Sequence, residues 1–555
     1  MTDLEIPLHK RTRLYRFFEM LPALMSWGAI VLLVVTSLIN PLLAAIYLLL
    51  IAVTVFIRAI AIAYHMIVGR ERLRQAEKIP WHTFLEDLEQ RSTKVGGRTY
   101  FDKQHLENVE MIARSVDGYP YPSEIYNAVI IATYNEPYEV LEGTIKSLVD
   151  TTYANDHLIV MIAYEERGGE TTEHVVQRLK QRFDNTFFIF ETVKHPKNLP
   201  DEVIGKGGNI TYAGKQLKLI LEKRKLSPAN VIVTTLDSDN RPHPAYFDYV
   251  TYEYILHDDR KHLSYQPISL FFNNIWDVPA AMRVVATGNS FWNIISAMRP
   301  HTLRNFASHS QPMDALIEMD FWSTHTIVED GYQYWRSYFH FDGRYDVVPI
   351  FVPIYQDAVM SDTYMKTLKA QFVQLRRWAY GASDVPYVAT RVFTKQRTVP
   401  LWGGLTRFFR LLDGHVTLAC IPVLVTFGGW VPLWINFHAT QSVAANQLPD
   451  ALGAIQRVAM VGLIITVFLT FKMLPPRPSR YRRRRTLGMV LQWVLMPVTA
   501  LCYSATSAYY SQTRLLLGKY MTKFDVTEKA TVVMIEQAKD RRRRKRNALS
   551  IILKK

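Results

Sequence analysis

The stretch Val231-Ile232-Val233-Thr234-Thr235-Leu236-Asp237-Ser238-Asp239-Asn240 joins a short apolar run directly to a polar cluster. The apolar part is rich in β-branched residues, and a run of this length is typical of a buried strand. Two carboxylates follow at the point where the strand ends. Ligands of open α/β sheets bind at the carboxyl ends of the strands. The stretch therefore predicts a central strand that delivers two aspartates to a binding edge.

Similar apolar runs occur earlier in the chain, and amphipathic helical patterns alternate with them. The predicted strands are Asn127–Thr133, Leu158–Tyr164, Phe187–Phe190 and Val231–Leu236. The predicted helices are Tyr138–Val149, Thr172–Phe183 and Gly208–Lys223. This alternation predicts an α/β fold with a parallel, Rossmann-like sheet.

Polar residues follow the first strand as well as the fourth. Thr133-Tyr134-Asn135-Glu136-Pro137 and Asp237-Ser238-Asp239-Asn240 are expected at the same edge of the sheet. Paired carboxylates one residue apart can share Mg²⁺ or Mn²⁺, because these hard cations prefer oxygen ligands. The alternative is a turn rich in Asp and Asn, and an isolated D-x-D is more often such a turn.

Two further short motifs carry charge suited to an anionic substrate. Lys206-Gly207-Gly208-Asn209 places a cation in a small loop that opens a helix, which is a favourable place for anionic oxygens. It is not a Walker A loop, because G-K-[ST] with its upstream glycine is missing. Glu329-Asp330 lies beyond the predicted sheet and suits a catalytic base. A lone Glu-Asp pair is otherwise usually a solvated helix start.

The pentapeptide Gln374-Leu375-Arg376-Arg377-Trp378 combines two guanidinium groups with an indole. Arginine binds phosphate oxygens through two parallel hydrogen bonds, and tryptophan offers a flat apolar face on which a sugar ring can rest. The simpler interpretation is a basic anchor near lipid headgroups. The pentapeptide alone favours that simpler interpretation.

The composition indicates a membrane protein. The chain has 555 residues, 49% of them hydrophobic, and a net charge of +15. Basic runs gather at both ends and before Thr486, which excludes neither nucleic acid nor membrane, but membrane flanks are the commoner explanation and no nucleic-acid partner is expected. The predicted membrane spans are Leu21–Ile39, Leu42–Ile57, Val416–Ile435 and Val458–Phe471.

The flanking arginines place both ends of each hairpin on the cytoplasmic side. Residues 487–517 are predicted to form an interfacial helix or a re-entrant hairpin, which gives four spans in total, with six as the alternative. The predicted divisions are an N-terminal transmembrane hairpin (1–69), a charged helical connector (70–124), a cytoplasmic α/β domain (125–400), an interface helix with a transmembrane hairpin (401–486), interfacial or re-entrant helices (487–517), and a basic C-terminal segment (518–555).

Taken together, ATYNEP (132–137), KGGN (206–209), DSDN (237–240), VED (328–330) and QLRRW (374–378) have the order and rough spacing of family 2 glycosyltransferases. Phe524-Asp525-Val526-Thr527-Glu528-Lys529 also resembles the F-x-V-T-x-K gating loop of bacterial cellulose synthase. The chain thus resembles a membrane-integrated, cellulose synthase-like processive polysaccharide synthase. The resemblance covers about four hundred residues, and it implies a GT-A-like cytoplasmic domain between transmembrane helices.

The resemblance also implies a role for each matching residue. The donor-binding residues would be Thr133, Tyr134, Glu136, Glu165, Lys206, Asp237, Asp239, Gln374 and Arg377. Asp239 and Asp237 would be the metal ligands for Mg²⁺ or Mn²⁺, and Asp330 would be the general base. Trp378 would bind the acceptor, and the gating residues would be Phe524, Val526, Thr527 and Lys529.

The sequence departs from the family pattern at a few positions. Ala132 replaces a common proline, Glu165 lies near a usual aspartate, and Val328 replaces the threonine of T-E-D. These departures concern the choice of nucleotide more than the chemistry, because the carboxylates nearest the reaction are present. A recognisable receptor domain for a cyclic dinucleotide is missing after the gating loop, so regulation by that messenger would need a separate partner.

The expected activity is inverting transfer from a UDP-sugar to a growing glycan, with secretion through the chain's own helices. The expected partners are the UDP-sugar donor, a glycan acceptor, membrane lipid and accessory secretion or regulatory subunits. The expected location is a bacterial inner membrane with the catalytic domain in the cytoplasm. Transfer of a single sugar to a lipid-linked acceptor and a catalytically silent membrane scaffold are the alternatives.

Overall fold

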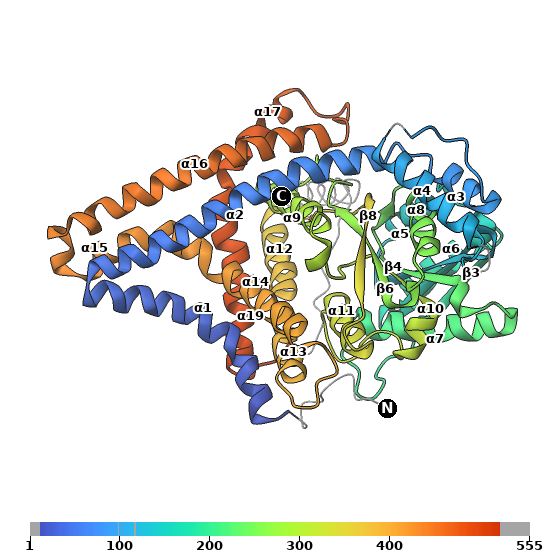
Figure 1. Ribbon diagram of the computed structural model, residues 1–555, viewed down its shortest axis with the longest axis horizontal. Helices are drawn as coiled ribbons and strands as arrows, with labels where there is room; N and C mark the ends of the chain where they lie inside the picture. The colour runs from blue at the N-terminus through green and yellow to red at the C-terminus, as the bar shows by residue number, and fades with distance from the viewer. Residues whose placement is uncertain (1–10, 98, 116–117, 522–555) are drawn as a thin grey trace, which may run out of the picture.

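A computed structural model describes residues 11–97, 99–115 and 118–521 of the chain. An α/β domain occupies one end of the molecule, and long helices project from it toward the other end (Figure 1). The gating residues Phe524, Val526, Thr527 and Lys529 lie outside the described residues, so the structure does not address them.

The α/β domain is built on one sheet with the strand order β3-β2-β1-β4-β7-β6-β8-β5. Its first half consists of parallel neighbours: β1 Tyr126–Thr133, β2 Leu158–Glu165, β3 Ile189–His195 and β4 Val231–Asp237. These strands match the predicted ones, except that β3 begins and ends later than Phe187–Phe190. Because β3 is an edge strand, it carries the polar residues Glu191, Thr192 and Lys194, which disguised its pattern.

The second half of the sheet is mixed, and this corrects the expectation of a purely parallel sheet. It contains β5 Arg241–Pro242, β6 Leu263–Leu270, β7 Ser310–Pro312 and β8 Asp346–Tyr355. The short β7 runs antiparallel to both β4 and β6, whereas β6 and β8 are parallel. The α/β class is confirmed, and the domain is placed among helices long enough to span a membrane.

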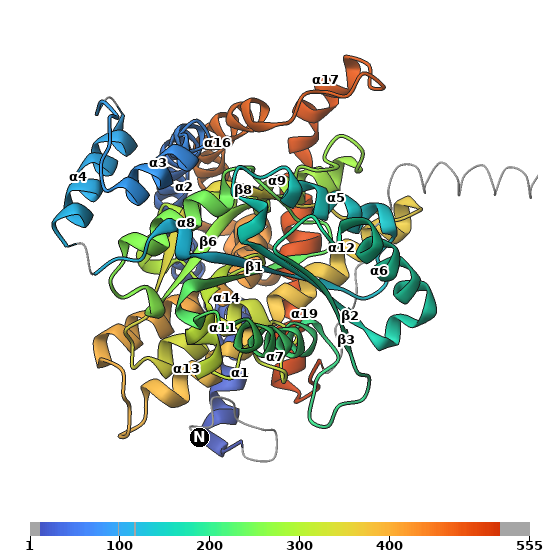
Figure 2. The same cartoon turned by 90° about the vertical axis from the view of Figure 1, so that its right-hand side faces the viewer.

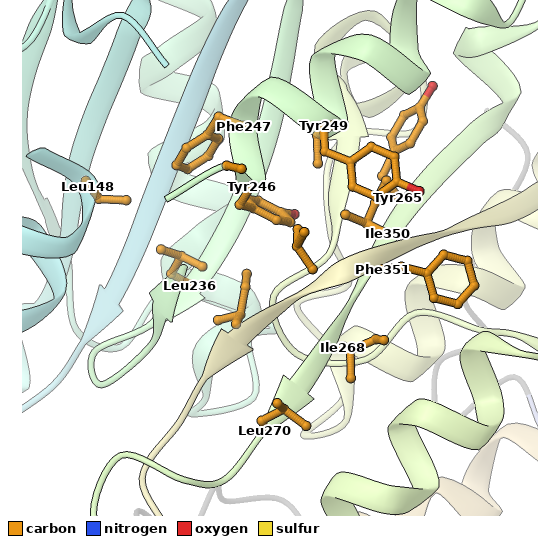
Figure 3. Packing of buried hydrophobic residues seen from close by; sticks show 14 of the residues in the cluster. Leu148, Leu236, Tyr246, Phe247, Tyr249, Tyr265, Ile268, Leu270, Ile350 and Phe351 are labelled. Carbon is orange, nitrogen blue, oxygen red and sulfur yellow. The ribbon is translucent and has the colours of Figure 1, made fainter. Parts of the chain in front are cut away.

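Helices cover both faces of the sheet (Figure 2). Alternate residues of β1 point to opposite sides, so Val129 and Ile131 join one apolar core while Ala128 and Ile130 join the other. Figure 3 shows the first core, where Leu236 of β4 lies near the aromatic side chains of Tyr246 and Phe247 of α8. The helices of this part of the chain are α5 Tyr138–Val149, α6 Gly169–Phe183, α7 Lys206–Arg224, α8 Tyr246–Leu256, α9 Ala280–Ala297, α10 Met313–Glu318, α11 Glu329–His340, α12 Tyr364–Ala379 and α13 Asp384–Val392.

Two connector helices, α3 Trp81–Gln90 and α4 Tyr100–Arg114, pack on the outside of α8. The Trp81 ring stacks on Tyr249 with centroids 3.7 Å apart. His105 is buried between Asp87 and the Tyr252 hydroxyl, at 3.0 and 2.9 Å. Although the sequence of this segment is largely polar, it contacts the α/β domain through stacked aromatic rings and buried hydrogen bonds.

The projecting part consists of α1 Arg13–Ile39, α2 Pro41–Ala76, α14 Leu401–Phe427, the short α15 Val431–Ile435 and α16 Val443–Met473. Within the described residues, four stretches are long and apolar enough to cross a membrane. They are Arg13–Ile39, Pro41–Ala76, Leu401–Ile435 and Arg484–Leu516. The first three contain three of the predicted spans, and the remaining predicted span lies within α16.

The stretch Arg484–Leu516 comprises α17 Arg484–Leu491, α18 Met496–Thr499 and α19 Thr506–Leu516, with 3-10 and π turns between them. Near its start, Gln492 Oε1 accepts a hydrogen bond from Arg283 of α9 at 2.5 Å. Near its end, the Ser511 hydroxyl donates to the Arg376 carbonyl of α12 at 2.6 Å. Both ends of the stretch therefore contact the α/β domain.

The beginning of α1 closes onto the end of α19. Arg16 donates hydrogen bonds to the carbonyl oxygens of Leu515 and Leu516, each at 2.5 Å. Glu19 is 2% exposed and accepts hydrogen bonds from Arg11 and from the Tyr520 hydroxyl, both at 2.8 Å. Residues at opposite ends of the sequence thus form one buried polar cluster.

Candidate active site

The predicted polar motifs meet at Lys206, the first residue of α7. Its Nζ lies 3.0 Å from Asp237 Oδ1 at the end of β4 and 3.3 Å from Asp330 Oδ1 at the start of α11. Glu329 Oε1 is 3.9 Å away. Burial acts to lower the pKa of Lys206, but the three carboxylates more than offset burial and raise it. A permanently charged ammonium therefore joins the DSDN and VED motifs.

The glycine after Lys206 allows this junction to form. A Cβ built on Gly207 would lie 2.2 Å from the Ser323 carbonyl oxygen, so only glycine permits the loop before α11 to come so close. The Thr211 hydroxyl, one turn later on α7, donates to the Trp322 carbonyl at 2.9 Å. Asn209 Nδ2 donates to the Ala163 carbonyl at 2.8 Å and so fixes α7 to the end of β2.

Gly207→Ala is expected to impair the site more than the fold. The new methyl group must displace the backbone at Ser323, which moves Asp330 relative to Lys206. Misplacement of a reacting group by about 1 Å can reduce turnover roughly 10²-fold. Steady-state turnover measures the effect. Gly331→Ala on α11 is the control, because a Cβ there meets nothing within 4 Å, and equal losses in both variants would contradict this role of Gly207.

The second aspartate of DSDN is held differently from the first. Asp239 is 3% exposed, and its Oδ2 accepts a hydrogen bond from the Asp357 backbone N–H at 2.9 Å. Asn273 Nδ2 donates to the Asp239 carbonyl at 3.0 Å. The Asp237 side chain is 36% exposed. Asp239 is thus rigidly positioned from two loops, whereas Asp237 faces the open edge of the sheet.

The donor set of this edge matches a cation that is shared with a substrate. Within the described part of the chain, no group of three or more His, Cys, Asp or Glu side chains is arranged to hold a metal ion. Asp237 and Asp239 offer two carboxylates, and Mg²⁺ characteristically binds through one or two carboxylates plus substrate phosphates. The two aspartates therefore fit Mg²⁺ or Mn²⁺ when phosphate oxygens complete the coordination.

The TYNEP turn after β1 is shaped by its own glutamate. Glu136 Oε2 accepts hydrogen bonds from the Thr133 hydroxyl at 2.6 Å, from the Tyr134 N–H at 2.8 Å and from the Asn135 N–H at 3.1 Å. Its carboxylate is therefore committed to holding the turn. Glu136 therefore supports the turn that carries Thr133 and Tyr134.

Glu165, at the end of β2, is paired with Arg167. The Arg167 guanidinium also lies over the Tyr134 ring, 5.1 Å from its centroid. A Cβ on the following Gly168 would lie 2.2 Å from the Tyr134 carbonyl oxygen, so the two turns are in close contact. The sequence motifs did not include Arg167. Its position two residues after the end of β2 could have indicated that it lies at the binding edge of the sheet.

The two carboxylates of the VED motif differ in their exposure to solvent. The Asp330 side chain is 22% exposed and that of Glu329 is 4% exposed. Burial and the neighbouring Asp330 raise the pKa of Glu329, whereas Lys206 and Arg377 act to lower it. The charge of Arg377 therefore reaches the VED motif, which brings QLRRW into the same site.

The other predicted residues of QLRRW lie on the same helix, α12. Gln374 is 8% exposed and accepts a hydrogen bond from Gln371 at 3.1 Å. Trp378 is 39% exposed and its ring lies 5.9 Å from that of Phe271. Trp378 thus presents a partly exposed aromatic ring beside Phe271.

Sequence reasoning also missed His309, which precedes β7. It is 1% exposed, and its Nδ1 lies 2.9 Å from the Phe306 carbonyl oxygen, which requires a proton on Nδ1. Burial lowers the pKa of His309, while the charge of Asp330 acts in the opposite direction. A neutral imidazole therefore lies within the electrostatic range of Asp330. The preceding motifs gave no sequence signal for it.

Glu329→Gln is expected to make the stability of the protein less dependent on pH. Because the pKa of Glu329 is raised in the folded protein, the folded state loses stability as the pH rises from the ordinary value of 4.5 through the raised value. Near pH 8 the variant should therefore be more stable than the parent, by about 1 kcal/mol or more in the free energy of unfolding. This difference should become smaller toward pH 5. A gap that does not change with pH in thermal melts would contradict the burial of this charge.

No protein-family model and no curated protein matches the sequence. Among solved structures, the fold is similar to that of the mannosyltransferase PcManGT from Pyrobaculum calidifontis in complex with GDP-Man and Mn²⁺. The two share 13% identity over 84% of this chain and 99% of that chain, with a TM-score of 0.39.

Two further structures are similar. For S. aureus TarS 1–349 with UDP-GlcNAc, the identity is 12% over 73% of this chain and 95% of that chain, with a TM-score of 0.35. For GalNAc-T7 with UDP, GalNAc and Mn²⁺, it is 9% over 52% of this chain and 56% of that chain, with a TM-score of 0.28. All three neighbours are glycosyltransferases. Because each TM-score is below 0.5, the chemistry of this chain has to be argued from its own residues.

Proposed function

We propose that the chain is a membrane-bound family 2 glycosyltransferase that moves a sugar from a UDP-sugar to a glycan acceptor with inversion at the anomeric carbon. The observation that carries this proposal is the position of Lys206 between two carboxylates. Its Nζ lies 3.0 Å from Asp237 Oδ1 and 3.3 Å from Asp330 Oδ1. A cation between a phosphate-facing carboxylate and a base-like carboxylate suits a reaction in which a diphosphate departs as a hydroxyl is deprotonated.

The donor is proposed to bind along the carboxyl ends of β1, β2 and β4. Thr133 and Tyr134 line the nucleotide pocket, with Glu136 and the Glu165–Arg167 pair as their support. Arg377 and Lys206 neutralise the diphosphate. When bound by Asp237 and Asp239, Mg²⁺ or Mn²⁺ supplies further positive charge to the leaving group.

Asp330 is proposed to act as the general base. Its carboxylate is partly exposed, so an acceptor hydroxyl can reach it, and Lys206 orients it from the side of the donor. Asp330 takes the hydroxyl proton as the oxygen bonds to the anomeric carbon, and the bond from that carbon to the departing UDP breaks on the opposite side. Burial raises the pKa of Glu329, so its neutral form already carries a proton and cannot accept this one.

The product is proposed to be a polysaccharide that leaves through the projecting helices. Trp378 is half exposed next to Phe271, which suits stacking against the terminal sugar of an acceptor. We take residues 484–516 as an interfacial stretch, because both of its ends contact the α/β domain. Four remaining spans then keep the α/β domain in the cytoplasm of, for example, a bacterial cell.

Product sizing separates this function from its alternatives. Purified protein in nanodiscs is incubated with a panel of UDP-sugars and Mg²⁺ or Mn²⁺, and UDP release and product length are measured. Long products are expected with one donor, and Trp378→Ala should shorten them, whereas Trp292→Ala, an exposed tryptophan of α9, should not. A single-sugar product would favour transfer to a lipid-linked acceptor, and the absence of UDP release with every donor would favour a silent scaffold.

A further inference from the structure

The segment from Arg477 to Val498, here called the α17 segment, follows α16, contains α17 and ends within α18. It has two contrasting faces. One face packs on the α/β domain. Trp493 stacks with Phe291 of α9 at a centroid distance of 6.1 Å, and Met489 is 2% exposed beside it. The α17 segment therefore has a fixed orientation on the domain.

The opposite face is apolar and open. Exposed aliphatic residues recur three or four positions apart, which places them in one stripe of a helix. The stripe consists of Leu487 (60% exposed), Val490 (44%), Leu491 (61%), Val494 (79%) and Val498 (53%). A contiguous apolar patch of this kind on a protein surface marks an interaction site.

Arginines border this stripe at its N-terminal end. Arg477, Arg482, Arg483 and Arg484 are all exposed. Among the described residues, no acidic side chain forms an ion pair with Arg482, Arg483 or Arg484, whereas the neighbouring Arg480 is paired with Asp277 at 2.6 Å. Positive charges gathered at the start of a helix also oppose its dipole. The arginines therefore do not serve to stabilise α17.

We propose that the α17 segment is a binding surface for anionic lipid headgroups. The aliphatic stripe enters the acyl boundary, and Arg482, Arg483 and Arg484 hold phosphate groups above it, which is the pattern of an interfacial amphipathic helix on an acidic leaflet. The segment begins at Arg477, four residues after the 31-residue helix α16 ends at Met473. The proposal depends on the membrane location in the proposed function and not on its chemistry.

The same segment is clamped to a loop of the α/β domain. Arg480 and the Tyr481 hydroxyl each donate to Asp277 Oδ1 at 2.6 Å. Arg485 donates to the carbonyl oxygens of Trp276 and Val278 at 2.8 and 3.2 Å. Residues 276–278 are therefore held by the residues on either side of the lipid-facing arginines.

That loop leads directly to the active site. Asn274, three residues before Asp277, exchanges two hydrogen bonds of 2.8 Å with the backbone of Ala358. Its neighbour Asn273 donates to the Asp239 carbonyl, and the Asp357 N–H donates to the Asp239 carboxylate. Headgroup binding thus orders the loops that position Asp239, and anionic lipid is expected to tighten binding of the donor.

The test compares nanodiscs of phosphatidylcholine with nanodiscs that also contain phosphatidylglycerol. The readouts are retention of phosphatidylglycerol by the detergent-purified protein, measured by native mass spectrometry, and the affinity for UDP with Mn²⁺, measured by calorimetry. The parent protein should retain the anionic lipid and bind UDP several-fold more tightly in the anionic discs. Substitution of Arg482, Arg483 and Arg484 by glutamine should abolish both effects.

The control removes the same charge elsewhere, by replacing Lys215, Lys218 and Lys223 of α7 with glutamine, and it should behave as the parent does.

Leu491→Gln with Val494→Gln tests the stripe independently and should weaken lipid retention even where the arginine variant misfolds. Lipid retention equal in the parent and in both α17-segment variants would overturn the proposal. Equal UDP affinity in the two kinds of disc would overturn the link to Asp239. If UDP does not bind in any disc while retention depends on the arginines, the proposed function fails and the lipid surface stands.

Discussion

Asp330→Asn is expected to reduce turnover by about 10² to 10⁴-fold, because a general base contributes roughly that factor. The asparagine keeps the size of the side chain and its position beside Lys206, which lies 3.3 Å from Asp330 Oδ1 in the parent. Donor affinity should therefore change little. Single-turnover rates, together with calorimetric binding of UDP, separate the chemical step from binding.

A matched variant sharpens this result. Asp156→Asn makes the same substitution at a carboxylate that is 82% exposed, just before β2 and at the opposite edge of the sheet. It should leave both turnover and UDP affinity as in the parent. If Asp330→Asn retained near-parental turnover, the general base would have to be another group of the site.

Lys206→Met is expected to cost both stability and donor binding. The ammonium is 8% exposed, and its loss leaves the carboxylates of Asp237 and Asp330 to repel each other. Removing one partner of a buried ion pair costs about 3–5 kcal/mol, and the partial exposure of Asp237 places the loss near the lower limit. Because the folded protein raises the pKa of Lys206, this contribution is fully present at neutral pH, well below the ordinary lysine value of 10.5.

Lys215→Met on the same helix is the control for this loss. Lys215 pairs with Asp320 at 2.9 Å, but both side chains are largely exposed, and such a surface pair contributes about 0–1 kcal/mol. Denaturant melts at neutral pH compare the two variants. Equal stability of Lys206→Met and Lys215→Met would show that Lys206 is not the junction of the site.

The parallel half of the sheet was predictable because each strand is a short apolar run followed by polar residues. The antiparallel β7 was not, because Ser310-Gln311-Pro312 has no apolar pattern and pairs only through its neighbours β4 and β6. Similarly, the charged residues Glu191 and Lys194 interrupt the apolar pattern of β3, so its full extent was not predicted. An edge strand tolerates charge on its exposed side.

The motif residues of the site were predictable, but their partners were not. Asp237, Lys206 and Asp330 stand in recognisable short patterns, and their convergence follows from the carboxyl ends of the strands. Arg167, His309 and Asp357 belong to no such pattern. They reach the site through turns and a backbone N–H, and contacts of that kind depend on tertiary geometry that a linear pattern does not encode.

The closure of Arg16 and Glu19 onto residues 515–520 has a consequence for biosynthesis. The hydrogen bond from Arg16 to Leu515 spans 499 positions of sequence, so the two partners are translated far apart in time. The Glu19 carboxylate can pair with Arg11 and Arg16 early in synthesis, whereas its third partner, the Tyr520 hydroxyl, is translated 501 residues later. Such long-range contacts form late and slowly, because chain entropy has to be lost before they are gained. Docking of the segment around Tyr520 against α1 can therefore occur only after both have been translated, and nascent chains truncated before Tyr520 would leave Glu19 paired with Arg11 and Arg16 but without the tyrosine hydroxyl.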